Sequence, residues 1–407
     1  MASSGSEEKP DLHVMIIGAG VTGLLIAQGL KNNGISFSIF ESESTSSRPR
    51  SREWGMSIHW SRPLLKELLP DELLDKIREA QVDPSYDTSN PKGYAVPFYN
   101  AKTGEHIVDI PMVNAIRVSR RKMRALCAEG IDILYGKKLV SLTSTPSDVT
   151  GTFADGTTAT GSICIGTDGA QSAVRQLALP GETGRAIPLE VVLYNLNVCY
   201  GDAEKSKAVR SVHFMNSVAL HPEKNLSIWT SIQDVPDANK PETWQYQIMP
   251  TWLADGKTHE GGAKGLVELK EVAAHLAEPW KSSLLWIPDD TDVTYSSVSY
   301  WPTIEWDSQH GTLTLAGDSA HPVPPHRGQG LNHGIADAHN FIKAVLDIKN
   351  GTRTKGVAIE EYNAELVKRG ADEVETSRRN ALLVHDFEKF MDSPVLNKQG
   401  YGKSKVN

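Results

Sequence analysis

Short apolar runs that stop at polar or glycine positions alternate with a helical pattern at the start of the chain. Residues 14–17 (VMII) form an apolar run that ends at Gly18, which is typical of a buried parallel strand. Residues 24–30 repeat apolar positions with helical spacing, and residues 36–40 (SFSIF) form a second β-like run that ends at Glu41. This order of strand, glycine turn, helix and strand predicts a βαβ unit.

Helices and hairpins follow this unit in turn. Helical stretches are expected at residues 63–80 and 119–130, and pairs of alternating β-like runs are expected at residues 93–113 and 149–169. The first helical stretch contains a proline that should break it, because proline lacks the N–H that a helix interior needs. The two hairpins are expected to turn at residues 102–104 (KTG) and at Asp155-Gly156.

The character of the chain changes between about residues 186 and 300. Short runs rich in β-branched and aromatic residues, separated by polar gaps, predict a mostly antiparallel sheet with one helical stretch at 265–280. A glycine-bounded strand returns at 311–318, and helical patterns occupy most of the remaining chain. We therefore expect an α/β fold in which a Rossmann-like domain is split in sequence and a β-rich domain is inserted.

The expected domain boundaries follow from these changes in pattern. The polar, acidic residues 1–12 are expected to be a disordered leader. The other expected segments are the Rossmann-like domain at 13–80, 105–182 and 300–350, the β-rich domain at 81–104 and 183–299, and C-terminal helices at 351–407.

Composition excludes several classes of protein. The 407 residues are 39% hydrophobic and 23% charged, as in ordinary globular proteins. A net charge of −8 gives no overall basic surface, so nucleic acid is not an expected partner. The three cysteines lack metal-ligand spacing, and no metal site is expected. Without a signal-peptide pattern or a run of about eighteen apolar residues, the chain is expected to be cytoplasmic with no integral membrane segment.

The turn after the first strand has the spacing of a dinucleotide-binding motif, G-x-G-x-x-G, at Gly18, Gly20 and Gly23. The first glycine turns the chain, the second lets the backbone approach a pyrophosphate, and the third lets the helix pack closely on the strand. Glu41 follows the second strand at the distance where a carboxylate accepts ribose hydroxyls and repels a 2′-phosphate. The motif therefore favours FAD or NAD, although a glycine-rich turn that binds nothing has the same pattern.

Two further strand ends carry an aspartate beside a glycine. Asp168 lies in GTDGAQSAVR, and Asp318 lies in AGDSAHPVPPHRGQGLN. An ionised carboxylate is costly to bury without partners, so both aspartates are expected to meet polar groups. Asp168 could do so by capping the helix that follows it. Asp318 precedes three prolines and a cluster of glycines, so it could lie in a tight structural turn or meet a ligand that lies against bare backbone.

These three motifs, in this order and spacing, resemble the group A flavoprotein monooxygenases, which are single-component FAD-dependent aromatic hydroxylases, and in particular those of fungal secondary metabolism. The resemblance covers about residues 13–345 and implies tightly bound, non-covalent FAD. The positions matched to the cofactor-binding residues of that family are Gly18, Gly20, Gly23, Glu41, Arg52, Arg120, Asp168, Asp318, Gly328, Gly330, Leu331 and Asn332.

The resemblance also implies how these positions divide the cofactor. The first glycine motif and Glu41 would hold the ADP half, and Asp318 would accept hydrogen bonds from the ribityl chain. The backbone of residues 328–332 would pass under the isoalloxazine, and the N-terminus of the following helix would stabilise negative charge on the reduced ring. Arg120, or Arg121 in its place, matches the arginine that contacts FAD.

Two more matches concern a mobile loop and a motif that contacts both nucleotides. Arg52 matches less closely the arginine of a mobile loop, and Asp168 with Arg175 matches a motif implicated in binding both FAD and NADPH.

Three residues are the candidate catalytic groups. Pro325 matches the proline beside the reactive face of the flavin, and Arg327, with His326, would make the turn electropositive. His59 is the candidate base for a phenolic substrate, with His213 as the alternative.

The implied activity is that of a monooxygenase. NADPH would bind transiently and reduce FAD, which would react with O₂ and transfer one oxygen atom to a bulky aromatic or polyunsaturated small molecule by hydroxylation or epoxidation. Aromatic residues of the β-rich region could line the substrate pocket or form sheet core. Two alternatives stay open on the sequence: a dehydrogenase or oxidase of the same fold that inserts no oxygen, and a protein that binds FAD without turnover.

Overall fold

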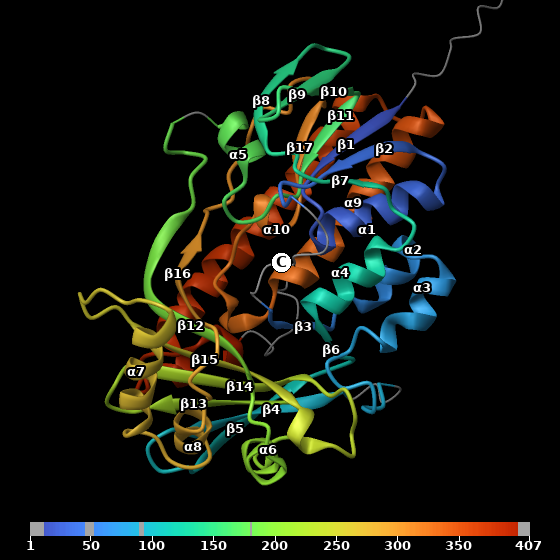
Figure 1. The fold of residues 1–407 in the computed structure, drawn as a ribbon. Helices are drawn as coiled ribbons and strands as arrows, with labels where there is room; N and C mark the ends of the chain where they lie inside the picture. Colours follow the sequence, from blue (N-terminus) through green and yellow to red (C-terminus); the bar gives the residue numbers. More distant parts are fainter. Residues whose placement is uncertain (1–11, 45–52, 89–92, 180, 398–407) are drawn as a thin grey trace, which may run out of the picture.

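The computed structural model describes residues 12–44, 53–88, 93–179 and 181–397. An α/β part with a parallel sheet lies above a β-rich part with a larger sheet, and long helices run between them (Figure 1). The candidate Arg52 and residues 1–11 of the expected leader lie outside the described residues. This architecture confirms the expected α/β fold with an additional, mostly antiparallel sheet.

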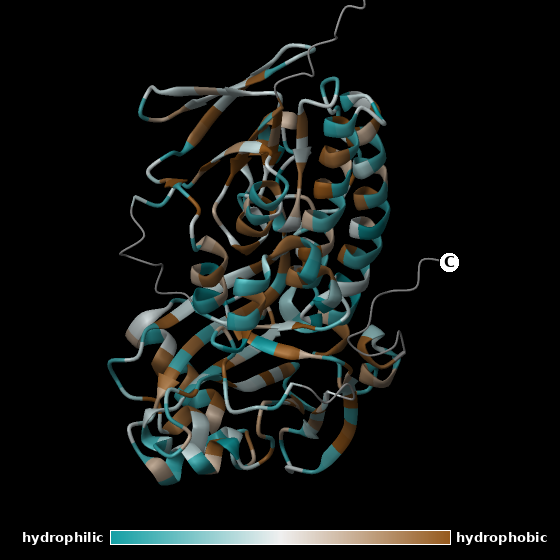
Figure 2. Cartoon of the chain, turned by 90° about the vertical axis from the view of Figure 1, so that its right-hand side faces the viewer, coloured by the Kyte–Doolittle hydropathy of each residue, from teal (hydrophilic) through white to brown (hydrophobic). Residues whose placement is uncertain are grey.

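The sheet of the α/β part has five parallel strands. Their order is β17 (Leu313–Leu315), β11 (Ile163–Gly166), β1 (His13–Ile17), β2 (Ser36–Phe40) and β7 (Ile133–Leu134). Met15 aligns with Cys164 on one side and with Ser38 on the other. Val14, Met15 and Ile16 are fully buried, so both faces of this sheet are covered, as is usual for a parallel sheet. Figure 2 shows hydrophobic residues along these strands.

The helices that pack with this sheet come from several parts of the chain. They are α1 (Val21–Asn32), α4 (Arg120–Ala128), α5 (Ala173–Ala178), α9 (Gly330–Asn350) and α10 (Lys355–Leu383). α1 packs against α9, although about 300 residues separate them in sequence, and α9 packs against α10. Gly351, with φ of 73°, ends α9 in the left-handed conformation that favours glycine.

The larger sheet has seven strands. Their order is β16 (Val293–Tyr300), β12 (Ile187–Cys199), β15 (Gln245–Leu253), β14 (Leu226–Asp234), β13 (Asn216–His221), β4 (Tyr94–Asn100) and β5 (His106–Met112). All neighbours are antiparallel except β13 and β4. β5 pairs with β4 across the turn at 102–104, so the expected boundary at residue 104 divided one hairpin and was misplaced.

The two faces of this sheet have different neighbours, as the alternation along β12 shows. Tyr194 points toward the helical side, where its hydroxyl donates to Glu268 at 2.7 Å. Asn195 and Asn197 point the other way and donate to the backbone oxygen of Glu53, in the segment that leads into the α/β part. The helices that cover the first face are α6 (Ala203–Arg210), α7 (Gly262–Ala273) and α8 (Trp280–Leu285); in Figure 1, α6 and α8 lie below the sheet and α7 lies at its left.

Smaller elements complete the fold. They are the pair β3 (Gly55–Ile58) and β6 (Ile116–Ser119), the meander β8 (Leu139–Ser144), β9 (Val149–Phe153) and β10 (Thr158–Gly161), and the helices α2 (Leu65–Leu68), α3 (Asp71–Asp75) and α11 (Pro394–Asn397). Pro70 separates α2 from α3, which confirms the expected break. The β-rich region contains α6 and α8 as well as the helix expected there, so the expectation of one helix was wrong.

Two features are absent from the described segments. None of their helices is long and apolar enough to cross a lipid bilayer. No group of three or more His, Cys, Asp or Glu side chains in them is placed to hold a metal ion.

The third glycine of the first motif generates a prediction about stability. A Cβ on Gly23 would lie 2.2 Å from the backbone oxygen of Gly18, so neighbouring backbone must shift to admit it. We expect Gly23→Ala to lower the free energy of unfolding by about 1–3 kcal/mol, as overpacking does. Gly356→Ala is the matched control, because a Cβ there would meet only ordinary contacts at 3.8 Å. Denaturant titrations of both variants measure the effect, and equal stability of the two would contradict it.

Candidate functional site

The carboxyl ends of β1, β11 and β17 bring the three sequence motifs to one edge of the parallel sheet. The backbone around Thr167 lies so close to Gly18 that a Cβ there would be 2.6 Å from the Thr167 oxygen, and Gly18 has φ of 108°. Thr167 Oγ1 donates to the Gly18 oxygen at 2.7 Å. A Cβ on Gly317, the residue before Asp318, would lie 2.9 Å from Thr22 Oγ1. The motifs therefore form one site, which we call the strand-end site.

The N-terminus of α1 is open within this site. Gly20 is its N-cap, no side chain accepts from the first turn, and no acidic residue lies in that turn. A Cβ on Gly20 would meet no heavy atom of the described chain closer than 4.0 Å. Free N–H groups and the helix dipole make such an end a binding site for phosphate.

Glu41 lies beside this helix end with its carboxylate held in place. It accepts from the backbone N–H groups of Glu43 at 2.9 Å and Ala19 at 3.0 Å. Burial alone would raise the pKa of Glu41, but these two hydrogen bonds and the charge of Arg124 outweigh burial and lower it. The side chain is therefore an ionised acceptor, and a carboxylate has lone pairs enough to accept from further hydroxyls.

Arg124 is a residue of this site that the motif analysis missed. Its Nε donates to the Ala19 oxygen at 2.7 Å, and its guanidinium pairs with Glu43 at 3.1 Å and with Glu41 at 3.6 Å. Its Nη2 is buried and has no hydrogen-bond partner among the described residues. Arg124 lies four residues after Arg120, and this helical spacing places both arginines on one face of α4.

Arg120, rather than Arg121, faces the strand-end site. Its guanidinium lies over the Trp54 ring at 4.7 Å, and its charge lowers the pKa of Asp318. Arg121 is exposed, and its backbone N–H donates to Glu53. The geometry therefore favours Arg120 over Arg121, and a contact between Arg120 and FAD stays a prediction.

Asp168 caps a helix. Its carboxylate accepts from Ser172 Oγ at 2.5 Å and from the backbone N–H groups of Ala173 at 2.7 Å and Val174 at 3.2 Å, in the first turn of α5. Burial raises the pKa of Asp168 in spite of these hydrogen bonds. The capping alternative therefore accounts for this side chain, and a direct contact between Asp168 and a cofactor stays a prediction.

Arg175 connects the second and third motifs from inside the protein. It is fully buried and lies over the Trp301 ring. Its guanidinium donates to the backbone oxygens of Ser319 at 2.7 Å and Ala170 at 2.6 Å. Burial lowers the pKa of Arg175 to about 10, which leaves it charged at neutral pH. A residue so enclosed holds loops together rather than contacting a passing nicotinamide.

Asp318 is the open carboxylate of the site. Its side chain is exposed, and no residue in the described part of the chain donates a hydrogen bond to it. The protein that surrounds it nevertheless desolvates the carboxylate and raises its pKa, although His321, Arg120 and Arg175 act in the opposite direction. Such a carboxylate gains most from hydroxyl donors that a ligand supplies.

The glycine turn after Asp318 also presents bare backbone. Pro325 and Gly328 are exposed, and Gly328 adopts φ of 59° with open space where a Cβ would be. A Cβ on Gly330 would lie 3.4 Å from Asp318 Oδ1. α9 then begins at Gly330 without a side-chain cap, so its N-terminus is open like that of α1. Leu331 is half-buried in the same turn.

Asn332 and His59 lock this turn from beneath, and the expectation that His59 is a catalytic base was wrong. Asn332 Oδ1 accepts from the His59 backbone N–H at 3.0 Å, and Asn332 Nδ2 lies 3.0 Å from His59 Nε2. Burial and the nearby charges of His333 and Arg327 lower the pKa of His59 to about 3. The ring is therefore a neutral, buried partner of Asn332 and cannot reach a substrate.

The alternative base, His213, is also engaged. Its Nδ1 accepts from the backbone N–H groups of Met215 at 3.2 Å and Asn216 at 3.1 Å, and burial lowers its pKa to about 4. His213 thus shapes the turn before β13.

The expected electropositive turn at His326 and Arg327 was wrong as well. Arg327 is fully buried, and its charge is balanced by an ion pair with Glu373 of α10. Burial lowers the pKa of His326 well below its usual value, so the ring is neutral. Neither side chain therefore adds net positive charge to the turn, and the open end of α9 is left to favour an anion there.

The tautomer of His326 follows from its neighbours. His385 Nδ1 lies 2.5 Å from the Ala381 oxygen, which can only accept, so His385 Nε2 is an acceptor. Thr251 Oγ1, at 2.8 Å, donates to that nitrogen. His326 Nε2 then donates to Thr251 at 3.3 Å, and its buried Nδ1 lone pair meets no donor in the described segments.

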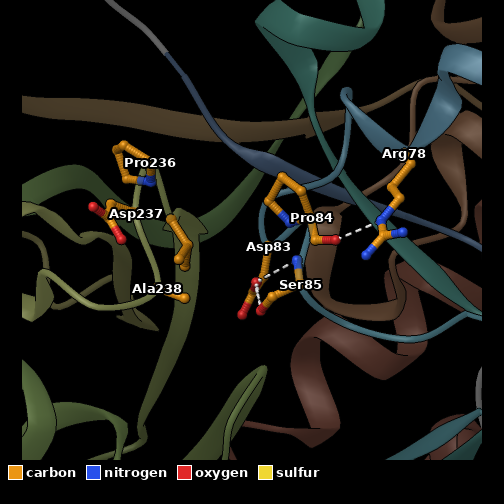
Figure 3. A pocket seen from close by; sticks show the side chains of 8 residues that line it. Arg78, Asp83, Pro84, Ser85, Pro236, Asp237 and Ala238 are labelled. Atoms are coloured by element: carbon orange, nitrogen blue, oxygen red, sulfur yellow. Dashed lines mark hydrogen bonds between the residues drawn. The ribbon is translucent and has the colours of Figure 1, made fainter.

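A hollow of about 500 Å³ elsewhere on the described surface is not this site. Arg78, Asp83 and Pro84 line one side and residues 235–238 the other, as Figure 3 shows. Asp83 is engaged by Ser85 and by Arg210 at 2.5 Å. No residue of the three motifs lines this hollow.

Comparison with known proteins agrees with the geometry. Residues 11–377 match the family described as FAD binding domain. The FAD-dependent monooxygenase phnB of Penicillium herquei is 41% identical over 397 residues, which are 96% of this chain and 95% of that protein. The FAD-dependent monooxygenase cctM of Talaromyces islandicus is 37% identical over 385 residues, which are 94% and 95% of the two chains.

A solved structure shares the fold. The 2,6-dihydroxypyridine-3-hydroxylase of Arthrobacter nicotinovorans superimposes with a TM-score of 0.75, at 16% identity, over 98% of this chain and 99% of its own. At this identity the likeness shows the fold alone.

The buried state of His59 generates a prediction about pH. Its pKa is about 3 in the folded protein, whereas a histidine in an unfolded chain titrates near ~6.5. As pH falls below that value, the unfolded chain binds a proton that the folded protein refuses, so stability falls. Between pH 7 and pH 5 this group alone should lower the free energy of unfolding by about 2 kcal/mol. When denaturant unfolding is measured at both pH values, the stability of His59→Gln should fall by about 2 kcal/mol less than that of wild type. An unchanged difference would show that His59 titrates normally in the fold.

Proposed function

This chain belongs to the FAD-dependent monooxygenases that carry this FAD binding domain, and on that premise we propose that it uses NADPH and O₂ to oxidise a bulky aromatic or unsaturated small molecule. Binding of FAD and the monooxygenase class follow from membership of the family. The electron donor, the hydroxylation or epoxidation of such a substrate, and a place in secondary metabolism are our proposal. The observation that carries it is the strand-end site, where two open helix ends and an open carboxylate meet.

The residues present fit FAD. A dinucleotide needs an uncapped helix end for its pyrophosphate, an acceptor for its ribose and bare backbone against its flat ring. α1, Glu41 and the Gly328–Asn332 turn provide these in order. Asp318, which lacks a donor in the described chain, and Arg124, whose Nη2 pairs with Glu41 but makes no hydrogen bond there, are polar groups that such a ligand would satisfy.

We propose the following division of labour. The first glycine motif and Glu41 hold the ADP half, with Arg124 fixing Glu41, and Arg120 approaches from α4. Asp318 accepts from the ribityl hydroxyls, and the backbone of Gly328, Gly330, Leu331 and Asn332 lies against the isoalloxazine. Pro325, exposed at the start of the turn, borders the reactive face. Asp168 acts indirectly, since its carboxylate caps α5. The assignment of Arg52 stays a prediction.

When bound, FAD accepts electrons from the nicotinamide and activates O₂. The chain supports this chemistry mainly through the open N-terminus of α9, whose N–H groups stabilise negative charge placed before them. NADPH is proposed to bind transiently, because one strand–glycine–helix motif, already assigned to FAD, is present in the sequence.

The substrate is proposed to lie against the face of the seven-stranded sheet that is turned toward the glycine turn at residues 328–332. Trp229 on β14 lies under the guanidinium of Arg117 at 5.3 Å. Arg117 donates to Ser231 at 3.0 Å and to Gln247 at 2.9 Å. Asn216 pairs with Ser231 across the strands, and both polar atoms of its buried amide lack a partner in the described chain.

A short series of hydrogen bonds joins this face of the sheet to the glycine turn. Arg117 Nη1 donates to Ser57 Oγ at 3.3 Å, and the Ser57 backbone oxygen accepts from Asn332 Nδ2 at 2.9 Å. An aromatic ring beside Trp229 could therefore reach Asn216 with a hydroxyl or keto oxygen while another part of it faces Pro325. With His59 excluded as a base, no histidine is proposed to take a proton from a substrate hydroxyl, because His326 Nδ1 is buried and the pKa of His326 is lowered as well.

The open state of Asp318 generates a prediction about cofactor content. We expect purified Asp318→Ala to lose most of its bound FAD while staying folded, because the ribityl hydroxyls lose their acceptor. Asp372→Ala, an exposed aspartate on α10, is the control and should keep wild-type occupancy. The ratio of flavin absorbance to protein absorbance measures the outcome, with circular dichroism as the check on folding. Full occupancy in Asp318→Ala would show that the carboxylate is not a ligand.

The proposed reaction is tested with the purified holoprotein and a panel of polycyclic phenols. Anaerobic NADPH should bleach the flavin bands, faster with a phenol that binds, and air should restore them with formation of an oxygenated product. Labelled ¹⁸O₂ should place one labelled atom in that product. Restoration by air with hydrogen peroxide as the sole product, whatever the phenol, would support an oxidase instead.

A further inference from the structure

A stripe of polar residues lies on the buried face of α10, outside every motif of the sequence. Glu365, Arg369, Glu373 and Ser377 repeat at intervals of four residues, which places them in one row along the helix, with Glu365 at its exposed end. Arg369 is 4% exposed, Glu373 is 1% exposed and Ser377 is fully buried. Ionised groups are costly to bury unless they are paired, so a row of this kind calls for a specific explanation.

Arg369 reaches the turn that carries Asp318. Its Nη2 donates to Asp337 Oδ1 at 2.6 Å. The other oxygen of Asp337 accepts from the backbone N–H of Gly317 at 2.7 Å and lies 2.6 Å from His321 Nε2. Burial would raise the pKa of Asp337, but His321 and Arg369 lower it strongly, so the carboxylate is ionised. Arg369 thus holds the residue before Asp318 through one buried carboxylate.

Glu373 reaches the glycine turn one helical turn further along. It forms an ion pair with Arg327 and accepts from Ser377 Oγ at 2.6 Å. Although burial acts against it, the interaction with His333 and the charge of Arg327 lower the pKa of Glu373 to about 2. Glu373 therefore holds the residue that immediately precedes Gly328.

His333 lies between the two halves of the row. Arg369 Nη1 lies 3.0 Å from His333 Nδ1, and since an arginine can only donate, Nδ1 accepts and the proton lies on Nε2. Nε2 lies 3.6 Å from Glu373 Oε2. Hydrogen bonds run from Gly317 through Asp337 and Arg369 to His333, and an ion pair joins Glu373 to Arg327. Between these two parts, His333 Nε2 lies beside Glu373 but makes no hydrogen bond in the described chain.

We propose that Arg369 and Glu373 are positioning residues for the cofactor: through Asp337 and Arg327 they fix the distance between the Asp318 turn and the glycine turn that lies against the flavin ring. This inference rests on the proposed FAD site and adds a function for α10, which supplies no cofactor contact of its own. One rigid helix that grips both turns four residues apart sets their separation, which neither turn can set alone.

The experiment compares apoproteins titrated with FAD, whose fluorescence is followed as it binds. Arg369→Met and Glu373→Gln should each raise the Kd of FAD at least tenfold under conditions where circular dichroism shows a folded chain. The midpoint potential and visible circular dichroism of the flavin bound at saturating FAD should also shift, which a loss of stability alone would not cause. Arg369→Lys, which keeps the charge, should restore part of the affinity.

Matched controls lie on the same helix. Arg378 and Glu375 form an ion pair at 2.7 Å on the outer side of α10. Arg378→Gln and Glu375→Gln should leave both the Kd of FAD and the potential unchanged. A double-mutant cycle tests whether Arg369 acts through the Asp318 turn. If it does, the double variant Arg369→Met with Asp318→Ala should lose less FAD-binding free energy than the sum of the losses in the two single variants.

Each outcome decides the matter. Wild-type Kd and potential in folded Arg369→Met and Glu373→Gln would overturn the inference and leave the row a device for stability alone. Should one of these variants fail to fold, the other decides, and wild-type values there would overturn the inference too. Failure of the wild-type chain itself to bind FAD would instead overturn the proposed function.

Discussion

Everything at the candidate site depends on the parallel pairing of β11 with β1 and β17. Parallel strands share one carboxyl edge, and each of these three ends in a motif: Gly18 after β1, Asp168 after β11 and Asp318 after β17. Contacts that admit no side chain then lock the motifs together, with the Thr167 backbone against Gly18 and Thr22 against Gly317. The site is thus a consequence of strand order, and the surrounding helices only refine it.

Charge is distributed unevenly at this edge, and its pattern indicates the chemistry of the ligand that the edge would bind. Glu41 is satisfied by backbone N–H groups and Arg124, and Asp168 is spent on the cap of α5. Arg327 is neutralised by Glu373 inside the protein. Asp318 alone of the three motif carboxylates has no donor within the described segments, and it faces two open helix ends. A ligand with hydroxyls beside a pyrophosphate and a flat ring completes this arrangement.

The sequence allowed the fold to be predicted because it depends on local pattern, whereas the cofactor contacts of the predicted residues stay a proposal. Glycine spacing, apolar runs and strand-end acids are visible in one dimension, and they identified Gly18, Glu41 and Asp318. Side-chain orientation is not visible in this way. His59 and Arg327 have the chemistry of catalytic groups, but packing turned both inward, where Asn332 and Glu373 engage them. Arg124, Arg369 and Glu373 were missed because their partners lie far away in sequence, although the spacing of four residues within α4 and α10 was a clue.

The central claim is that Asp318 and the glycine turn hold the ribityl chain and ring of FAD. A crystal structure of the chain with FAD bound tests it most directly. The account predicts the Asp318 carboxylate within hydrogen-bond distance of a ribityl hydroxyl, and the backbone of residues 328–332 in contact with the isoalloxazine. FAD bound with its ribityl chain turned away from Asp318, or with its ring apart from that backbone, would contradict it.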